Sequence, residues 1–365
     1  MEDLRVYQIA LKNITGIGAQ RARALIKYFG GLEEVFRADQ RLWAEVLSVG
    51  PATMRKMSRT LALEAARREL EFIESKGLDV VFFDEARYPH RLRHCSDAPI
   101  LLYQQGETDL NAKHTVAIIG TRNATPYGKD CVQKLIDGLK PLSPLIISGL
   151  ALGVDTLAHE HAVRVGLPTV AVLGHSLDRI YPSENKALAQ RMQQNGALLS
   201  EFEAGTKPDR ENFPQRNRIV AGMADVVVVI ETGVKGGSMI TVSQALSYNR
   251  DVCAFPGRAD NKMSRGCNLL IKRNQVQLIE GAKDLMYTMG WEVMEQRPVP
   301  QKQLFLELNT DEQAVYDRLV EAESLGLDSI SVACGWPVSK TSNTLLQLEF
   351  KGVIRTLPGK MYTLS

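Results

Sequence analysis

The pattern of hydrophobic and polar residues changes character along the 365-residue chain. Apolar side chains first recur at helical spacing, as Ala22, Leu25 and Phe29 do after a glycine-containing segment. Short β-branched runs bounded by Gly, Asp or Pro then alternate with helical patterns, before helical spacing returns near the C-terminus. These changes divide the chain into a helical domain at residues 1–70, an α/β domain at 71–290, a Pro- and Gln-containing linker at 291–310 and a small domain at 311–365.

The α/β segment contains seven candidate strands. Each is short, β-branched and bounded by residues that favour turns, and helical patterns separate them. Strands that are apolar on both faces and separated by helices predict a parallel, doubly wound sheet. Ligands of such sheets bind beyond the carboxyl ends of the strands, so the chemistry is expected in the loops at those ends. The candidate strands are Val80–Phe83, Thr115–Ile119, Leu145–Ser148, Thr169–Leu173, Ala197–Ser200, Asp225–Ile230 and Asp251–Phe255.

The C-terminal segment has the pattern of a winged helix. The residues from Thr310 to Gln313 have capping-box spacing in front of a helix. The run Ile330–Cys334, a glycine-containing turn and a second helix follow, and two short strands flank residues 357–360. A helix, a helix–turn–helix and a β-hairpin in this order are typical of a winged helix. Because the segment holds five Lys or Arg and seven Asp or Glu, a protein contact and a contact with a nucleic-acid backbone both stay open.

Two helix pairs are predicted in the first domain, and glycine-containing turns near Gly18 and Gly50 join the helices within each pair. This arrangement resembles the helix-hairpin-helix repeats of SAM-like domains, in which such turns bring backbone N–H groups close to a phosphate. Residues 1–60 hold ten Lys or Arg and six Asp or Glu, a local excess of positive charge. A structural helical cap, whose glycines serve only their backbone angles, explains the same residues, and both interpretations stay open.

The composition excludes several classes of protein. Hydrophobic residues make up 44% and charged residues 24%, which excludes a mostly disordered or fibrous chain. No apolar run approaches the ~18 residues of a membrane span, so we expect a protein that binds no membrane. The five cysteines are scattered and form no C-x-x-C pair, which predicts reduced thiols in a cytoplasm and no metal site. A net charge of +2 predicts no partner by itself, because a nucleic acid would need locally gathered cations.

The first strand-end loop, Gly120-Thr121-Arg122, leads into a helix. It matches neither G-x-G-x-x-G nor G-x-x-x-x-G-K-[ST], which disfavours a dinucleotide-binding domain and a Walker-A ATPase. A hydroxyl, a helix N-terminus and a forked guanidinium at one place suit an anion. We therefore assign Gly120, Thr121 and Arg122 to a candidate binding site.

The next strand-end loop runs from Ser148-Gly149 to Asp155, and its glycines let a ligand approach the backbone. Asp155 precedes His159 by about one helical turn, so a catalytic Asp–His pair is conceivable. No Ser or Cys nucleophile is obvious, however. We favour a structural role in which Asp155 orients the helix start and His159 packs beneath it.

Later strand-end loops add residues suited to a nucleic acid. Phe213 precedes Arg216, Asn217 and Arg218, which together offer stacking, phosphate and base-edge contacts. The residues Lys235, Gly236, Gly237 and Ser238 open a helix and have the pattern of an anion nest, and Asn268 and Lys272 add donors. Since one mononucleotide needs only one or two cations, seven basic residues at these loops favour a backbone with several phosphates. The seven are Arg122, Arg216, Arg218, Lys235, Arg258, Lys272 and Arg273.

The order of these motifs resembles the DprA/Smf DNA-processing family. The resemblance covers about residues 5–285 and is carried by A-I-I-G-T-R, S-G-L-A-L-G-V-D, Y-P-S-E-N, F-P-Q-R-N-R-I-V-A-G, G-G-S and R-G-C-N-L-L-I. It implies an extended Rossmann-like domain that binds single-stranded DNA, in a cytoplasmic homodimer that loads the RecA recombinase during natural transformation. It also implies that Arg122, Ser148-Gly149, Arg216 to Arg218 and Lys235 to Ser238 line the DNA pocket. The segment Ser238 to Val242 departs from the usual family pattern, so the rim of the pocket can differ in detail.

A nucleotide-processing enzyme of the related phosphoribohydrolase group is the alternative. Such enzymes resemble P-G-G-x-G-T-x-x-E, in which a Glu after the glycines acts at the glycosidic bond. Here no acid follows Gly236-Gly237 up to Gln244, and the nearest acid is Glu231, upstream on the strand. We therefore expect a binding protein with no catalytic residue and no cofactor.

Overall fold

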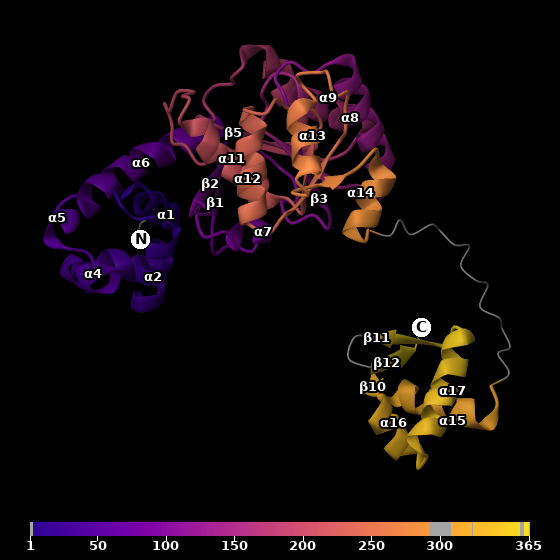
Figure 1. Ribbon diagram of the computed structural model, residues 1–365. Coiled ribbons are helices and arrows are strands. Elements are labelled where there is room, and N and C mark those ends of the chain that lie inside the picture. The colour runs from indigo at the N-terminus through magenta and orange to yellow at the C-terminus, as the bar shows by residue number, and fades with distance from the viewer. Residues whose placement is uncertain (1–2, 292–307, 323, 358–360, 365) are drawn as a thin grey trace. The chain divides into compact units, whose positions relative to one another are not determined.

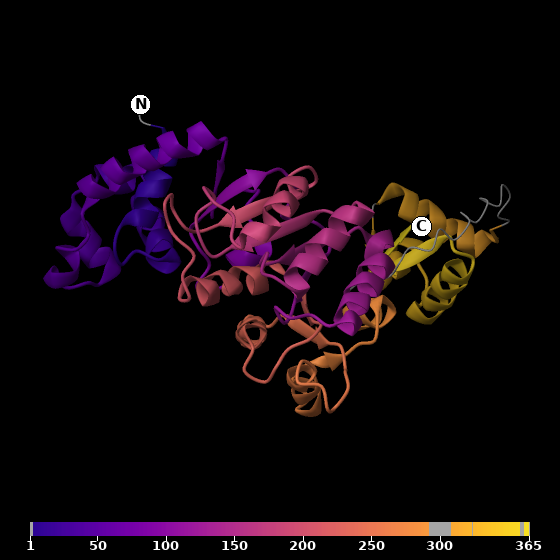
Figure 2. The same ribbon diagram turned by 90° about the horizontal axis from the view of Figure 1, so that it is seen from above.

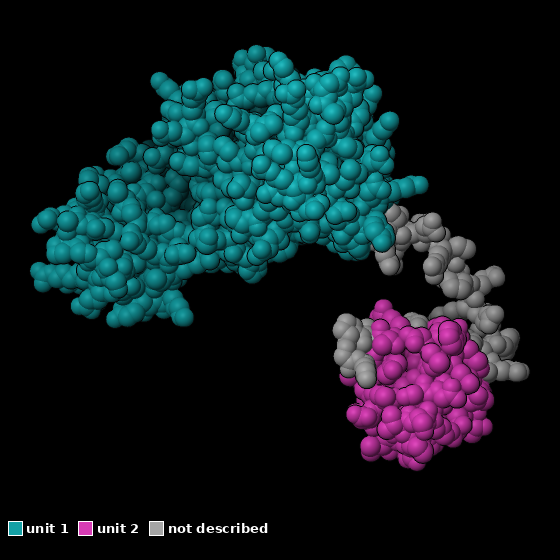
Figure 3. Space-filling model, in the orientation of Figure 1, with its two compact units in different colours: residues 1–293 teal, residues 294–365 magenta. Residues whose placement is uncertain are grey.

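The computed structural model describes residues 3–291, 308–322, 324–357 and 361–364. The chain forms two compact units, Met1–Val293 and Met294–Ser365, each with its own hydrophobic core (Figures 1 and 3). Most of the predicted linker and the predicted hairpin turn at 358–360 lie outside the described residues. Among the described residues, no helix is long and apolar enough to cross a membrane.

The predicted helical region at the N-terminus is confirmed. Side chains cap its first and last helices, because Asp3 accepts a hydrogen bond from the N–H of Arg5 and Ser58 from that of Leu61. The predicted boundary at residue 70 falls inside the last helix, which ends where Gly77 takes a left-handed conformation. The helices are α1 (Leu4–Asn13), α2 (Ala19–Phe29), α3 (Leu32–Arg37), α4 (Gln40–Leu47), α5 (Pro51–Met54) and α6 (Arg59–Lys76).

A nine-stranded sheet follows, in the order β1-β2-β6-β5-β4-β3-β7-β8-β9. The strands from β3 to β9 pair in parallel, as predicted. β2 pairs antiparallel with both β1 and β6, so the expectation of a wholly parallel sheet is wrong at this edge. The only helix between β1 and β2 is the four-residue α7 (His90–Arg93), which is too short to cross the sheet as a parallel connection requires. The strands are β1 (Asp79–Phe82), β2 (Leu101–Gly106), β3 (Thr115–Ile119), β4 (Leu145–Ser148), β5 (Thr169–Leu173), β6 (Gly196–Ser200), β7 (Val226–Val229), β8 (Asp251–Ala254) and β9 (Gln277–Leu278).

Helices cover both faces of the parallel part of the sheet (Figures 1 and 2). Along β3, Val116 and Ile118 join the core of α8, α9 and α14, whereas Ala117 and Ile119 join the core that includes α11, α12 and α13. The chain moves from β3 to β6 in one direction and returns to β7 beside β3, so β3 and β7 form a topological switch point. The helices are α8 (Pro126–Leu139), α9 (Val154–Val165), α10 (Lys186–Met192), α11 (Asn212–Met223), α12 (Gly237–Ser247), α13 (Arg265–Lys272) and α14 (Ala282–Met289), with short 3₁₀ turns at Lys140–Leu142 and Ser183–Asn185.

The second unit is a winged helix, as predicted. Its capping box is formed by Asn309 and Glu312, one residue before the predicted position. Each of the two side chains accepts a hydrogen bond of 2.9 Å from the backbone N–H of the other residue. Val315, Leu345 and Leu348 form the centre of its core. The elements are α15 (Thr310–Glu321), β10 (Leu325–Gly326), α16 (Leu327–Cys334), α17 (Val338–Phe350), β11 (Ile354–Leu357) and β12 (Met361–Leu364), with sheet order β10-β12-β11.

Candidate functional site

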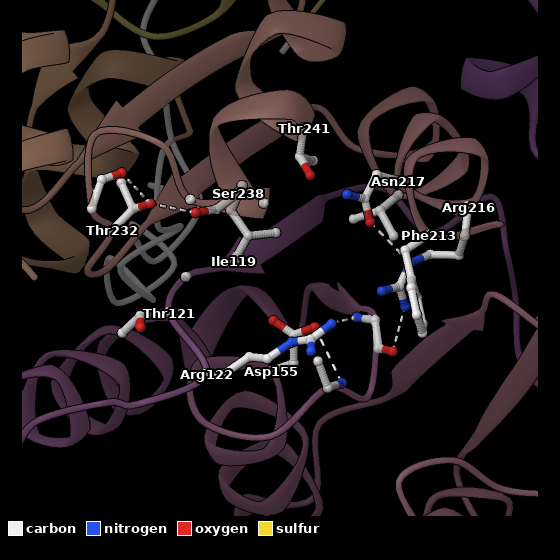
Figure 4. A pocket seen from close by; sticks show the side chains of 17 residues that line it. Ile119, Thr121, Arg122, Asp155, Phe213, Arg216, Asn217, Thr232, Ser238 and Thr241 are labelled. Carbon is white, nitrogen blue, oxygen red and sulfur yellow. Dashed lines mark hydrogen bonds between the residues drawn. The ribbon is translucent and has the colours of Figure 1, made fainter. Parts of the chain in front are cut away.

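A cavity of about 240 Å³ opens at the switch point between β3 and β7 (Figure 4). The loops after β3, β4 and β7 line it, together with residues of α11 and α12. Crevices at such switch points are where doubly wound sheets bind their ligands. The lining residues are Ile119, Gly120, Thr121, Arg122, Gly149, Ala151, Asp155, Phe213, Arg216, Asn217, Val220, Thr232, Gly233, Gly236, Gly237, Ser238 and Thr241.

Two glycines allow these loops to pack closely around the cavity. Gly149 lies against the guanidinium of Arg216, and a Cβ at this position would overlap it. Gly153 has a φ of +83°, and a Cβ there would overlap the backbone of Thr121 and Arg122. The glycines after β4 therefore bring the loops after β3 and β4 and the helix α11 together.

Arg122 is exposed and lies close to the ring of Phe213 (Figure 4). Its Cζ is 5.6 Å from the ring centroid, which is within the range of a cation–π interaction. Among the residues that the structure describes, no carboxylate forms an ion pair with Arg122. The ring of Tyr181 lies beside Phe213, with 6.3 Å between the ring centroids. This part of the cavity thus combines an unpaired guanidinium with aromatic surface, which suits a phosphate next to a flat base.

Arg216 is the second guanidinium of the cavity, but it is only 5% exposed. Its Nη1 donates hydrogen bonds to the carbonyl oxygens of Gly149 and Val172, the latter at 2.6 Å. Burial lowers the pKa of Arg216, and the nearby charge of Asp155 opposes this effect. Arg216 therefore holds the loop after β4 in place and supplies positive potential from within the wall.

Asp155 is buried at the start of α9. Its Oδ2 accepts hydrogen bonds from the N–H groups of Gly149 and Ala151, at 3.2 and 3.3 Å. Burial raises the pKa of this carboxyl group, although the charge of Arg216 acts in the opposite direction. Asp155 thus orients the loop before its helix, as the structural interpretation of this motif predicts.

His159 does not form a hydrogen bond with Asp155 within the described part of the chain. Its Nδ1 lies 2.7 Å from the hydroxyl oxygen of Thr169, and the ring is fully buried. Burial lowers the pKa of His159 to about 3, so the ring is neutral at physiological pH. The geometry supports the structural role for His159 rather than the catalytic pair.

The loop after β7 ends at the N-terminus of α12. No side chain caps this helix at Gly236, and its first-turn N–H groups carry partial positive charge. Beside them, the hydroxyl oxygen of Ser238 lies 2.6 Å from that of Thr232 (Figure 4). Backbone N–H groups and hydroxyl groups at a helix start favour an anion.

The cavity brings together ten of the fifteen residues that the sequence assigned to DNA binding. They come from four separate loops and helix starts, in agreement with the prediction that the strand-end loops form one site. The ten are Gly120, Thr121, Arg122, Gly149, Phe213, Arg216, Asn217, Gly236, Gly237 and Ser238.

Four of the other five predicted residues do not line the cavity and serve the surrounding structure or face solvent. The buried hydroxyl of Ser148 donates to the carbonyl oxygen of Ile118 at 2.6 Å. Asn268 exchanges two hydrogen bonds, of 2.8 and 3.1 Å, with the backbone of Gly257 and so fixes the loop after β8. Lys235 and Lys272 are exposed outside the lining of the cavity.

Arg218 lies in a different cleft, of about 690 Å³, between the helical segment and the sheet edge. It forms an ion pair with Glu201 and donates to the carbonyl oxygen of Asp97 at 2.5 Å. Because residues two apart on a helix point about 200° apart, Arg216 and Arg218 cannot face the same cavity. The two arginines therefore do not share one pocket, contrary to the sequence prediction.

Sequence reasoning did not identify Thr232 or Ala151, and it considered Asp155 for a catalytic pair but favoured a structural role. Thr232 lies two residues after the predicted run Asp225–Ile230, in the same loop as Lys235, and this position is a signal that could have identified it. Ala151 lies between the two glycines of its loop and carries no chemical signal of its own. Ala151 lines the cavity because the fold places its backbone there, and a sequence pattern does not reveal this.

Glu231, the acid considered for hydrolysis, is fully buried after β7. Its carboxylate accepts hydrogen bonds from the N–H and the hydroxyl of Thr125, at 2.9 and 2.6 Å, and so supports the start of α8. It is not among the lining residues of the cavity. Among the described residues, no group of three His, Cys, Asp or Glu side chains is arranged to hold a metal ion.

Sequence comparison relates most of the chain to known families. A family model for DNA recombination-mediator protein A matches residues 79–290, and one for the DprA winged helix domain matches residues 299–360. Protein Smf of Synechocystis sp. is 30% identical over 391 residues, with 98% of each chain covered. DNA processing protein DprA of Streptococcus pneumoniae is 37% identical over 238 residues, which cover 65% of this chain and 80% of that protein.

Solved structures give the same relationship. The X-ray structure of DNA processing protein A from Streptococcus pneumoniae superposes with a TM-score of 0.66 at 31% identity, covering 79% of this chain and 98% of that one. A structure of DNA processing protein A from Helicobacter pylori, which concerns the single-stranded DNA binding mode of that protein, has a TM-score of 0.53 at 34% identity. It covers 58% of this chain and 95% of the other.

Proposed function

The chain belongs to the DprA/Smf family of DNA-processing proteins, and on this premise we propose that it binds single-stranded DNA in the cavity between β3 and β7. The observation that carries the proposal is the exposed Arg122 beside Phe213, at a cavity that also receives the uncapped N-terminus of α12. A guanidinium and a helix N-terminus bind phosphates, and an aromatic face stacks on any base. The relative from Helicobacter pylori, whose structure concerns single-stranded DNA binding, supports this ligand.

Each part of the cavity has a role in this proposal. Arg122 contacts a phosphate at the exposed side, and the first turn of α12 with Ser238 receives another. Phe213 stacks on a base, and Tyr181 extends the aromatic surface. Arg216 keeps the loop after β4 in its binding position, because its hydrogen bonds end on the carbonyl oxygens of that loop and of β5.

The biological role we propose is the protection of incoming DNA and the loading of RecA onto it in natural transformation and recombination. The family description as a recombination-mediator protein supports this role. The protein is proposed to act as a homodimer in the cytoplasm. Sedimentation of the purified protein tests the dimer, and displacement of a single-strand-binding protein by RecA, followed as strand exchange, tests the loading.

We propose a binding protein rather than a phosphoribohydrolase. Glu231 supports this view, since its carboxylate is committed to Thr125 and lies outside the cavity lining. Incubation with nucleoside monophosphates and chromatography for free base tests it. Sustained base release that disappears in a Glu231→Gln variant would favour the enzyme.

The binding proposal is tested by fluorescence anisotropy with labelled single and double strands of the same sequence. We expect tighter binding of the single strand and a steep loss of affinity with salt. Arg122→Ala removes one phosphate contact and is expected to weaken binding about fivefold at 0.1 M salt, across sequences. Phe213→Ala removes a stacking surface worth about 1–3 kcal/mol, and is expected to weaken binding at least about fivefold.

Lys140→Ala is the matched control. Lys140 is exposed in the 3₁₀ turn between α8 and the start of β4, at the amino ends of the strands and away from the cavity. Its affinity for single strands is expected to equal that of the unchanged protein. If Arg122→Ala and Phe213→Ala bind as tightly as this control, the cavity is not the DNA site.

A further inference from the structure

A second groove, of about 490 Å³, runs between α8 and α9 and reaches α10. Most of its lining residues are polar, and Leu157 and Val163 are apolar. The lining residues of this α8–α9 groove are Lys129, Gln133, Leu157, Glu160, His161, Val163, Arg164 and Arg191. Three of them are cations and one, Glu160, is a carboxylate, so the groove is positively charged.

The three cations of the groove are exposed and have no carboxylate partner among the described residues. Elsewhere the same chain neutralises its arginines directly, as in the ion pairs of Arg87 with Asp79 and of Arg258 with Asp260. Unpaired cations gathered in one concave surface attract an anionic ligand, because no ion pair has to break before the ligand binds. Charge complementarity therefore selects a polyanion as the occupant.

A hydrogen-bond relay fixes the central cation. Arg164 donates to Nδ1 of His161, and Nε2 of His161 lies 2.7 Å from Oδ1 of Asp137. The imidazole is 4% exposed. It lies between the guanidinium of Arg164 and the carboxylate of Asp137 and contacts both. Arg164 is thereby oriented, yet its positive charge stays available to solvent.

One end of the groove lies at the carboxyl ends of the strands, where the cavity also opens, on the face of the sheet that α8 and α9 cover. Lys129 lies in the first turn of α8, the helix that follows the Arg122 loop, and Leu157 lies in the first turn of α9, which follows the Gly149 loop. From Leu157 to Arg164 the axis of α9 rises about 10 Å. A chain that leaves the cavity past Arg122 and crosses the carboxyl ends of the strands can enter the groove at the first turns of α8 and α9 and follow it for about two helical turns.

We propose that the α8–α9 groove is an extension of the DNA site, which holds the phosphate backbone of the single strand where it leaves the cavity. The inference rests on the proposed function and adds the path of the strand. Lys129, Arg164 and Arg191 contact successive phosphates without reading bases. The cavity binds a short strand alone, whereas a longer strand also occupies the groove.

The test compares two labelled strands, one of about 6 and one of about 20 nucleotides, by anisotropy at several salt concentrations. The variant is Lys129→Ala with Arg191→Ala, which leaves Arg164 and its relay intact. For the long strand, we expect the slope of log affinity against log salt to fall by about 1.4, and the affinity at 0.1 M salt to fall about twentyfold. For the short strand, both quantities should stay unchanged.

Two further variants serve as controls. Lys140→Ala with Lys283→Ala removes two exposed cations of the same unit outside the groove and should bind both strands normally. Lys129→Arg with Arg191→Lys keeps the charges and should restore the affinity for the long strand.

The results separate the groove from the cavity. Unchanged binding of the long strand by the groove variant, with normal binding of the short strand, overturns the groove and leaves the cavity; it points instead to an acidic protein surface as the occupant. Equal losses for the two strands also overturn it, because the groove would then not be an extension. An unchanged protein that binds neither strand overturns both the groove and the proposed function.

Discussion

Lys340 and Lys351 in the winged helix form ion pairs with nearby carboxylates, whereas Arg122 at the cavity of the α/β domain has no such partner among the described residues. Lys340, on the second helix of the helix–turn–helix, pairs with Asp311 at 2.9 Å and lies 4.3 Å from the ring centroid of Trp336. Lys351, at the end of that helix, pairs with Glu312 at 2.6 Å. These two lysines and Arg122 thus present their positive charge very differently, although each lies in a fold that can bind nucleic acid.

The comparison teaches that a count of basic residues does not predict a binding surface. A cation that is already paired must break that contact before it binds a phosphate, while an exposed unpaired one loses only water. The same contrast exists inside the α/β domain, where Arg216 is tied to carbonyl oxygens and Arg122 is not. The predictions for Arg216 and for the lysines of the winged helix test how far this division between structural and available cations holds.

The largest effect is expected on stability, from Arg216. Arg216→Leu removes a buried guanidinium and leaves the carbonyl oxygens of Gly149 and Val172 without their donor. We expect the free energy of unfolding of the first unit to fall by about 3 kcal/mol, measured by urea denaturation followed by circular dichroism. Arg122→Ala, at an exposed position, should change it by less than about 0.5 kcal/mol. A similar loss in both variants would contradict the division between the two arginines.

The second prediction concerns acid stability, and its source is His159. The folded pKa of about 3 lies below the ordinary value of 6.5, so only the unfolded chain takes up this proton between these values. The contribution of His159 therefore lowers the stability of the first unit as the pH falls below 6.5, by about 2 kcal/mol at pH 5. The second unit has no histidine, because all six lie before residue 176.

The measurement is the unfolding free energy of the first unit between pH 7 and 5, in the unchanged protein and in His159→Asn. Asparagine can keep a hydrogen bond to Thr169 but does not titrate, so the pH dependence should become shallower by that amount. The difference between the two proteins isolates His159 from the other ionisable groups. An identical pH dependence would show that His159 does not resist protonation in the folded state.

The smallest effects are expected in the winged helix. Lys340→Ala should leave the affinity for single strands within about twofold, since its charge is already paired. Lys351→Met should lower the stability of the second unit by at most about 1 kcal/mol, followed by the fluorescence of Trp336. A large loss of DNA affinity in Lys340→Ala would make the winged helix part of the DNA site.

The pH dependence sharpens this last measurement. The hydrogen bond from Lys351 lowers the pKa of Glu312 below its ordinary value of 4.5. The stabilisation is thus present above pH 4.5 and is lost as the pH falls through the lowered folded pKa. Lys351→Met should make this loss of stability at acidic pH smaller. An unchanged pH dependence of the unfolding free energy would contradict the role of the ion pair.

Much of the fold could be predicted because it depends on local pattern. The runs Thr115–Ile119, Leu145–Ser148 and Thr169–Leu173 match β3, β4 and β5 residue for residue, since each is an apolar run between turn residues. β2 was missed because its second half carries two glutamines, of which Gln104 is buried only through the sheet around it. β9 has two residues, which is too short for any periodicity.

The sequence by itself determined the order of strands and helices, the glycines that the strand-end loops need, and the motifs that relate the chain to its family. Only the tertiary structure decided which cations are available. Arg216 and Arg218 are near neighbours in sequence, yet one is buried in the wall of the cavity and the other pairs with Glu201 in another cleft. The physical reason is that a cation is neutralised by the carboxylates and carbonyl oxygens that lie next to it in the folded protein. Those partners, such as Glu312 for Lys351, come from distant parts of the chain.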